Sequence, residues 1–442
     1  MALGKEMQMK HPLDNEYANP SGSLASKCLV VMGALALSLF LLTLYAASPA
    51  EALVEGEDFV PGQVVVKLNP TVGATLDKIN ADYGTITLEK LPGSTGIYLL
   101  KVPADSDTQG LIGRLANDAR LLYAEPNFVA EAPKDSGGAS RHHAYGMSDN
   151  NDISEQYAAT ALGLPCAATL SLGQNSTVAV VDTGVQLDHP DLDENIEGVA
   201  RYDFVDNDRN PMDRAVGLDA DGDGLKDELA GHGTHVAGIV DLVAPAAEIM
   251  PLRVLNSEGR GNTFTIAKAI SYAKSNGANV INLSLGSSHR STMLQGVIND
   301  AIKGGVLVAA AAGNSNSLTP HYPAAGNGTT ASTDGLVGVT SVDMYAKKSD
   351  YANYGTWVDI SAPGDGIRST FPISMYANWS GTSMATPFIS GQAALIHALY
   401  GSLNPLGVEK KIRSSAQPLT LQNLTYTGML GAGEANVCVS LQ

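Results

Sequence analysis

The feature that most constrains the fold is an alternation of short apolar segments with helix-patterned segments from residue 177 onward. The apolar segments are rich in β-branched residues and span residues 177–181, 248–255, 278–285 and 305–311. Between them, residues 263–275 and 291–303 carry apolar side chains at helical spacing. Short continuous apolar strands separated by helices are typical of a parallel sheet covered on both faces. We therefore predict a doubly wound α/β domain with a mainly parallel sheet.

Polar residues and glycines fall where these predicted strands end. They are Asp182, residues 284–286 and residues 313–314. In open parallel sheets, ligands bind beyond the carboxyl ends of the strands. The functional site is therefore expected at this edge of the sheet.

Four segments carry residue types suited to nucleophilic catalysis. They are VVDTG (180–184), GHGTH (231–235), AAAGN (310–314) and SGTSMATP (380–387). A serine hydroxyl is a weak nucleophile at neutral pH, so an imidazole must take its proton and a carboxylate must orient that imidazole. Asp182, His232 and Ser383 supply these three groups. Each segment alone is also typical of a turn, a loop or an N-cap, but their combination and order favour a catalytic triad.

These segments resemble the subtilisin-like serine proteases, or subtilases, in which the order along the chain is also Asp, His, Ser. The resemblance covers about residues 150–442 and includes NVINLSLG (279–286) and GAGEAN (431–436). It implies that Asp182 orients the base, that His232 is the general base and that Ser383 is the nucleophile. It also implies that the Asn314 side chain donates to the oxyanion.

The same resemblance implies a set of substrate-binding residues. These are Ser284, Leu285, Gly286, Ala311, Gly313 and His321. Residues 284–286 would pair with the substrate backbone as an added strand. Ala311 and Gly313 would help to wall the primary side-chain pocket. His321 stands where related enzymes often have a small residue at the pocket floor, so we expect it to shape specificity; the alternative is a solvent-facing loop histidine.

A smaller unit precedes the catalytic region. Residues 59–129 predict an α+β unit that resembles the family's propeptide, an intramolecular chaperone and inhibitor with a ferredoxin-like fold. We divide the chain into a signal peptide or signal anchor (1–52), a propeptide (53–130), a linker with the processing site (131–151) and a catalytic domain (152–442). Self-cleavage is expected within residues 130–152.

The N-terminal region predicts export. Residues 28–47 are 20 residues without a charge, which is long enough to span a bilayer. The sequence Ala-Glu-Ala at 50–52 follows and suits signal peptidase. We interpret the segment as a cleaved signal of a secreted, extracellular protein, with an uncleaved membrane anchor as the alternative. Cys166 and Cys438 remain outside it, and both a disulfide and two free thiols stay open.

Acidic residues outnumber basic ones, 45 against 27, so the net charge is −18. A nucleic-acid binder needs a basic face, so this class is excluded. The surplus is local, because residues 182–228 alone carry 15 acidic and 4 basic side chains. We therefore expect these carboxylates to have a local role.

That role is predicted to be calcium binding. Asp219, Asp221, Asp223 and Asp227 occupy positions 1, 3, 5 and 9 of a calcium-loop pattern, with Gly224 at position 6. Position 12 is Ala230, so the loop is not an EF-hand. A second group, Asp203, Asp206, Asp208 and Asp213, resembles a metal-binding loop of thermitase-like subtilases. Hard carboxylate oxygens favour calcium over zinc; the alternative is a solvated acidic loop.

The resulting expectation is a secreted, calcium-stabilised serine endopeptidase made as a self-processing zymogen. Its partners would be protein or peptide substrates and its own propeptide. The alternatives are a catalytically silent binding or adhesion module on the same fold and a membrane-anchored protease.

Overall fold

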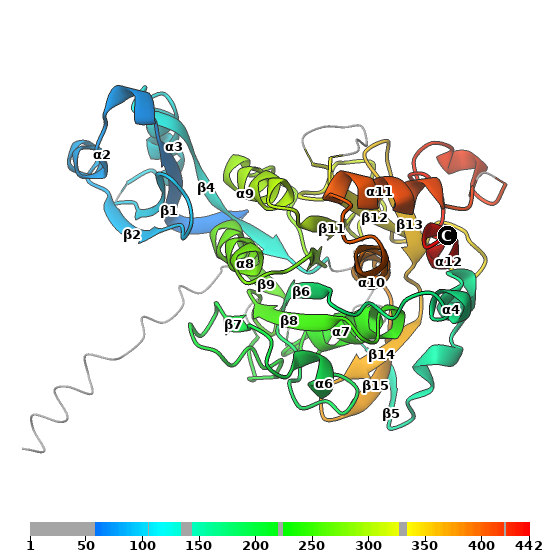
Figure 1. Cartoon of the computed structure of the whole chain (residues 1–442). Helices are drawn as coiled ribbons and strands as arrows, with labels where there is room; N and C mark the ends of the chain where they lie inside the picture. Colours follow the sequence, from blue (N-terminus) through cyan, green and yellow to red (C-terminus); the bar gives the residue numbers. More distant parts are fainter. Residues whose placement is uncertain (1–57, 105, 134–143, 220–223, 327–333, 420) are drawn as a thin grey trace, which may run out of the picture. The chain divides into compact units, whose positions relative to one another are not determined.

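The computed structural model describes residues 58–442 except 105, 134–143, 220–223, 327–333 and 420 (Figure 1). The predicted signal peptide or anchor at 1–52 lies outside the described residues, as do Asp221 and Asp223. Within the described part of the chain, no helix has the length and apolar character needed to cross a membrane.

The N-terminal unit is a four-stranded antiparallel sheet with two helices, in the order β2-β3-β1-β4. Its elements are β1 (Phe59–Leu68), a 3₁₀ turn (Pro70–Val72), α2 (Leu76–Tyr83), β2 (Ile86–Lys90), β3 (Ile97–Lys101), α3 (Thr108–Ala116) and β4 (Leu121–Glu131). The βαββαβ order confirms the predicted ferredoxin-like α+β fold. The sequence pattern did not predict β2, because none of its residues is buried.

Both faces of this small sheet are covered, which follows from the two-residue period of β1. Val64 and Val66 point to one face and pack with Leu100 of β3 and with apolar residues of α2 and α3 such as Leu111. Val65, between them, points to the other face and belongs to the hydrophobic core of the larger domain. The β-branched run at 64–66 therefore joins the two parts of the chain.

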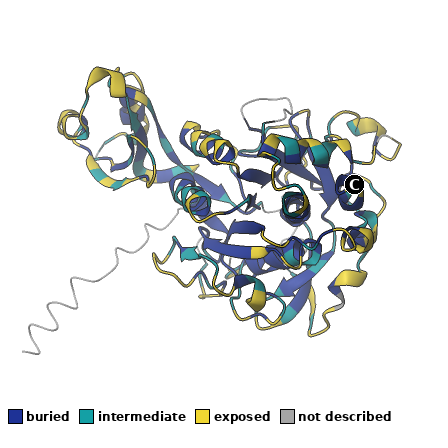
Figure 2. Ribbon diagram, in the orientation of Figure 1, coloured by how far each residue is buried: buried dark blue, intermediate teal, exposed yellow. Residues whose placement is uncertain are grey.

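The larger domain is built on a seven-stranded sheet in the order β13-β12-β11-β10-β6-β8-β7. All its strand pairs are parallel, which confirms the predicted doubly wound architecture. The strands are β6 (Thr177–Asp182), β7 (Tyr202–Asp203), β8 (Glu248–Arg253), β10 (Val280–Leu283), β11 (Leu307–Ala311), β12 (Leu336–Val342) and β13 (Ile360–Pro363). Figure 2 shows these strands as a buried layer.

Two pairs of helices pack against this sheet. The first pair is α8 (Thr263–Ser275) and α9 (Thr292–Lys303), close to the predicted bounds, and the second is α7 (His232–Val243) and α10 (Thr382–Leu399). The shorter helices are α4 (Tyr157–Ala161), α5 (Leu164–Ala167), α6 (Asp193–Ile196), α11 (Pro405–Ser414), α12 (Val437–Ser440) and the 3₁₀ segments Asp152–Glu155 and Leu424–Tyr426. Because α7 and α10 carry His232 and Ser383, their packing sets the distance between these two predicted site residues.

The expected linker at 131–151 is built into the larger domain at both ends. Glu131 ends β4, which pairs with β9 (Arg260–Asn262). At the other end, β5 (Tyr145–Ser148) joins β14 (Ile367–Phe371) and β15 (Met375–Trp379) in a three-stranded sheet. The sequence did not predict β5 because none of its side chains is buried, so it has no apolar alternation.

Cys166 in α5 and Cys438 in α12 form a disulfide, with Cα atoms 5.6 Å apart. This favours the disulfide over the free-thiol alternative. The bond closes a loop between residues 272 positions apart. Cross-links over long loops typically stabilise a domain by about 2–4 kcal/mol, because they restrict the unfolded chain.

Candidate active site

Asp182 and His232 form the centre of the site. Asp182 is the last residue of β6 and is fully buried, and His232 is the first residue of α7. The His232 Nδ1 atom lies 2.7 Å from Asp182 Oδ1, and the backbone N–H of Thr183 donates to the same oxygen. A carboxylate only accepts, so Nδ1 carries the proton and Nε2 is left as the basic nitrogen.

The backbone around His232 comes unusually close to the end of β6. A Cβ added at Gly233 would collide with the carbonyl oxygen of Gly184. The glycine after the histidine is therefore required by space, because a side chain would separate His232 from Asp182. The Trp379 ring packs edge-on against the imidazole of His232, with ring centroids 5.3 Å apart.

Asp213 holds the start of the helix that carries His232. Its buried carboxylate accepts from the backbone N–H groups of Gly231 and Thr234, at 2.9 and 3.0 Å, and from the Thr234 hydroxyl at 2.9 Å. Burial raises the pKa of this carboxyl to about 6, although the hydrogen bonds favour its charged form. Asp213 was predicted among possible metal ligands, and in the structure it lies at the N-terminus of α7.

Ser383 is the second residue of α10 and is 2% exposed. Its Oγ donates to the backbone carbonyl of Ser284 at 3.4 Å, and among the described residues no hydrogen bond joins it to His232. The hydroxyl is therefore directed toward Ser284 in this structure.

Pro387 links Ser383 to the neighbouring strand end. It lies inside the helix, as the sixth residue of α10. It has no N–H for the carbonyl of Ser383, four residues earlier. The Ser284 hydroxyl donates to that carbonyl instead, at 2.8 Å. Because Pro387 leaves the Ser383 carbonyl free to accept, the hydrogen bond from Ser284 can hold Ser383 in place relative to residues 284–286.

Asn314 follows β11 and is oriented by Thr382. Its Oδ1 accepts from the backbone N–H and the hydroxyl of Thr382, at 3.0 and 2.9 Å. These bonds direct Nδ2 into the site, where it donates to the carbonyl oxygen of Pro133 at 2.6 Å. The amide is thus placed to donate to a peptide oxygen, as expected of an oxyanion donor.

The predicted substrate-binding segment pairs with the chain's own residues. Glu131 and Gly286 exchange two backbone hydrogen bonds, of 2.8 and 2.9 Å. On the other side, Ala132 donates to the carbonyl of Gly259 at 2.9 Å. Residues 129–132 are therefore a strand between β9 and the segment after β10.

His321 lies between Gly286 and Gly313. A Cβ added at Gly286 would collide with the His321 ring, and one at Gly313 would lie 3.2 Å from its Cγ. The His321 Nδ1 is 3.4 Å from the Ala311 carbonyl oxygen. Burial lowers the pKa of His321 to about 4, so the ring is neutral at neutral pH. His321 is half-buried and also lines a cavity beside Pro133.

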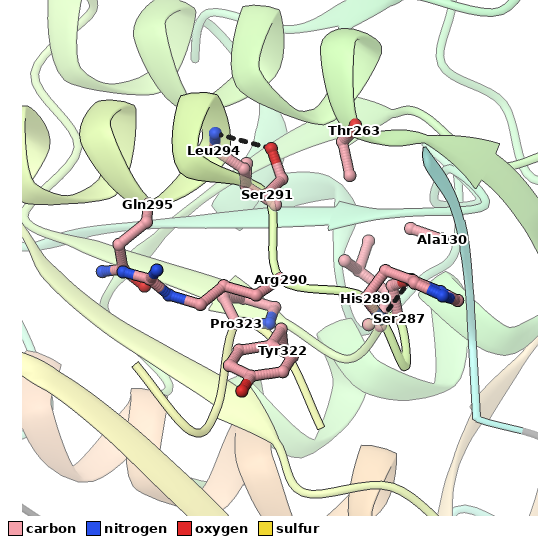
Figure 3. A pocket seen from close by; sticks show the side chains of 12 residues that line it. Ala130, Thr263, Ser287, His289, Arg290, Ser291, Leu294, Gln295, Tyr322 and Pro323 are labelled. Carbon is pink, nitrogen blue, oxygen red and sulfur yellow. Dashed lines mark hydrogen bonds between the residues drawn. The ribbon is translucent and has the colours of Figure 1, made fainter. Parts of the chain in front are cut away.

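Ala130 faces a separate apolar pocket. Figure 3 shows Ala130 beside Thr263, His289 and Ser291, with Tyr322 across the pocket. Leu285 and Leu294 also line it, and the remaining free volume is about 10 Å³. The pocket is therefore close to filled with alanine in place.

Two polar residues of β4 cap helices of the larger domain. Glu125 accepts from the backbone N–H groups of Thr292 and Met293 and from the Ser291 hydroxyl, at 2.8, 3.0 and 2.6 Å. Asn127 accepts from the backbone N–H of Phe264 at 3.0 Å. These groups lie at the starts of α9 and α8, where backbone N–H groups lack intrahelical partners. The sequence indicated only that this segment resembles the family's propeptide, and these capping contacts were not predicted.

Three of the predicted calcium ligands, Asp206, Asp208 and Asp227, contact protein groups. Asp206 contacts Arg253 at 2.7 Å and Arg214 at 3.0 Å, and Asp208 accepts from a backbone N–H. The Asp227 carboxylate accepts from three backbone N–H groups and the Ser257 hydroxyl. No three acidic, histidine or cysteine side chains gather as a metal site within the ranges that the structure covers. In this structure Asp206 and Asp208 are thus held by protein groups, and the predicted Asp219 loop includes undescribed residues.

Two family models match the chain. The model of the subtilase family matches residues 173–433, which include Asp182, His232, Asn314 and Ser383. The model of the fervidolysin N-terminal prodomain matches residues 46–127.

Curated relatives match over most of their own length. The thermophilic serine proteinase of Bacillus sp. (strain AK1) is 35% identical over 361 residues, which cover 76% of this chain and 78% of the relative. Thermitase of Thermoactinomyces vulgaris is 40% identical over 262 residues, covering 57% of this chain and 85% of thermitase.

Solved structures are also similar. A protease from Pseudoalteromonas arctica PAMC 21717 matches with a TM-score of 0.56 and 31% identity, over 63% of this chain and 93% of that chain. Fervidolysin from Fervidobacterium pennivorans, a keratinolytic enzyme related to subtilisin, matches with a TM-score of 0.69. This match covers 88% of the present chain and 62% of fervidolysin at 23% identity, which supports the fold.

The second histidine of GHGTH predicts a pH effect on stability. His235 is fully buried, its Nε2 donates to the carbonyls of Ile367 and Ala377, and burial lowers its pKa to about 3. An unfolded histidine titrates near about 6.5. Between these values only the unfolded chain binds the proton, so the folded state loses stability as pH falls below about 6.5.

We therefore expect His235→Gln to flatten the pH dependence of the unfolding free energy between about pH 4 and 6. The slope of the unfolding free energy against pH should decrease by about 1.4 kcal/mol per pH unit, which corresponds to one proton. Denaturant unfolding at several pH values, with and without the substitution in a Ser383→Ala background that prevents autolysis, measures it. Equal slopes would contradict the prediction.

Proposed function

The chain belongs to the subtilase family of serine proteases, and we propose that it is a secreted endopeptidase that acts through Asp182, His232 and Ser383. The observation that carries this proposal is the 2.7 Å contact between His232 Nδ1 and Asp182, which leaves Nε2 free to act as a base beside the nucleophile's helix. A protease of this class needs the base in that tautomer.

The reaction would begin when the Ser383 hydroxyl turns from the Ser284 carbonyl to His232 Nε2. As Oγ attacks the carbonyl carbon, His232 takes the proton, and Asp182 stabilises the imidazolium. The oxyanion would receive hydrogen bonds from Asn314 Nδ2 and from the backbone N–H of Ser383 at the start of α10. His232 then protonates the leaving amine, and water hydrolyses the acyl-enzyme by the reverse sequence.

We further propose that residues 53–133 are an inhibitory propeptide. Support comes from residues 129–132, which occupy the strand position that a substrate would take, and from Glu125 and Asn127, which cap α9 and α8. Export by the uncharged segment at 28–47 is part of the same proposal.

Replacing the nucleophile tests the activity. We expect Ser383→Ala to abolish labelling by a fluorophosphonate probe, to lower peptide hydrolysis by at least about 10⁴-fold and to accumulate unprocessed chain. Ser380→Ala is the matched control, because Ser380 lies three residues earlier and accepts only from the Gly366 N–H among the described contacts. Labelling or normal processing of Ser383→Ala would instead favour the silent binding module.

The position of His321 suggests a narrow primary pocket. A cavity of about 270 Å³ is lined by Glu131 and Pro133 on one side and by residues that include Gly286, Asn314 and His321 on the other. The imidazole occupies space between the two glycine walls that a larger substrate side chain would need. We propose that the protease prefers small residues before the cleaved bond.

The variant His321→Gly should widen the preference. We expect kcat/KM for a peptide with phenylalanine before the cleaved bond to rise about tenfold relative to the alanine peptide, because added apolar contacts are typically worth about 1–3 kcal/mol. A peptide series that differs only at this position measures the ratio, in which any loss of folded enzyme cancels. An unchanged ratio would remove His321 from the specificity determinants.

We also propose calcium binding at the loop that contains Asp219, Asp221 and Asp223. The support is the ligand spacing in the sequence and the carboxylate chemistry of the donors. Asp227 would act mainly as the anchor of this loop, since its oxygens already accept from residues 216–218 and Ser257.

Removal of the ion should destabilise the protein. We expect a chelator to lower the Tm and added calcium to restore it, because a ligand at about 100 times its Kd contributes about 2.7 kcal/mol. Asp219→Asn should reduce the calcium-dependent shift, whereas Asp193→Asn in the first turn of α6 should not. Identical melting with and without chelator would show a solvated acidic loop.

A further inference from the structure

The register of the strand in the cleft identifies one peptide carbonyl as the reacting group. Glu131 is paired with Gly286 through both backbone hydrogen bonds. In an antiparallel ladder the next hydrogen-bonded pair is two residues onward on one strand and two residues back on the other, so an extension of this bridge would pair Pro133 with Ser284. Ser284 is the residue whose carbonyl accepts from the Ser383 hydroxyl.

An independent contact points to the same residue. The Pro133 carbonyl oxygen accepts from Asn314 Nδ2 at 2.6 Å, and Thr382 fixes the orientation of that amide. Asn314 is the group proposed to stabilise the oxyanion, so the oxygen bound to it belongs to the carbonyl that is attacked.

We infer that the peptide bond after Pro133 is the bond at which this chain cleaves itself, so that the mature protein begins at Lys134. This rests on the proposed protease activity. Ser383 Oγ attacks the carbonyl carbon of Pro133, and His232 accepts the hydroxyl proton. The C–N bond to Lys134 breaks, and its nitrogen receives that proton. One water then hydrolyses the ester, leaving a carboxylate on Pro133 and a free Ser383 hydroxyl and releasing one proton to solvent.

The proline at this position also accounts for the resting geometry of the nucleophile. A residue other than proline at position 133 would donate its N–H to the Ser284 carbonyl, as the ladder requires. Proline has no N–H, so this carbonyl accepts from the Ser383 hydroxyl instead, at 3.4 Å. The hydroxyl is then directed away from His232, which slows the first cleavage.

The strand before Pro133 has the contacts of a bound peptide. Ala130 fits the nearly filled apolar pocket of Figure 3. Glu131 forms an ion pair with Arg260, with a distance of 3.0 Å between Oε1 and Nε. The partly buried Pro133 lies beside the cavity lined by His321. After cleavage these contacts remain, so the new C-terminus stays in the cleft until the prodomain dissociates.

The full-length chain provides the direct test. Intact masses are measured for the first fragments that appear during processing. We expect a prodomain fragment that ends at Pro133 and a partner fragment that begins at Lys134. Reading the C-terminus of the early prodomain fragment avoids confusion with later trimming of the mature N-terminus. A first cut after any other residue would overturn the assignment.

A substitution at the junction tests the role of the missing N–H. Pro133→Ala should be cleaved at the same bond about fivefold faster, because its N–H adds one hydrogen bond to Ser284 and releases the Ser383 hydroxyl. Pro103→Ala, in the same prodomain but after β3, should leave the processing rate unchanged. A Pro133→Ala chain that is cut elsewhere, or no faster than the wild type, would contradict the assignment.

The proposed protease activity and the proposed cleavage after Pro133 can be distinguished by experiment. If the processed enzyme hydrolyses peptides and is labelled at Ser383, but the prodomain fragment ends elsewhere, only the junction is overturned. If the chain neither hydrolyses peptides nor reacts with the probe, the proposed function and the junction fall together.

Discussion

The hydrogen bond between His232 and Asp182 is the interaction on which the rest of the site depends. It joins residues 50 positions apart, at the end of a central strand and the start of a helix. Gly233 lets the two backbones approach, and Asp213 accepts from the first N–H groups of α7. Trp379 packs against the other side of the imidazole. Once this pair is placed, α10 and the end of β11 need only bring Ser383 and Asn314 to the same edge of the sheet.

The N-terminal unit also contacts the edge of the sheet at which these residues lie. Its last strand extends from its own sheet into the cleft, where residues 129–132 hydrogen bond on both sides. Glu125 and Asn127 meanwhile satisfy the N–H groups at the starts of two helices. One continuous segment thus provides both sets of contacts, because the residues that dock the prodomain are only a few positions from the residues that lie in the cleft. This explains why β4 is longer than the prodomain sheet requires.

Local patterns predicted much of the architecture and the site. The strands β6, β8, β10 and β11 follow from short continuous apolar runs, because they are buried on both faces, and the helix α8 follows from the helical spacing of its apolar side chains. Strands without buried residues, such as β2 and β5, have no such apolar run and were not predicted. The role of Asp213 at the start of α7 was not predicted for a related reason. In an acidic stretch, the local sequence around an aspartate that binds a metal does not differ from the sequence around one that caps a helix.

The sequence alone determined which residue types are present and in what order, and this was enough to identify the family and to single out Asp182, His232, Asn314 and Ser383. Only the tertiary structure decided which groups face one another. It placed the Pro133 carbonyl at Asn314, the Ser284 hydroxyl at the carbonyl freed by Pro387 and the His321 ring between two glycines. The physical reason is that these contacts join segments far apart in the chain, and their geometry depends on strand register and helix packing rather than on local pattern.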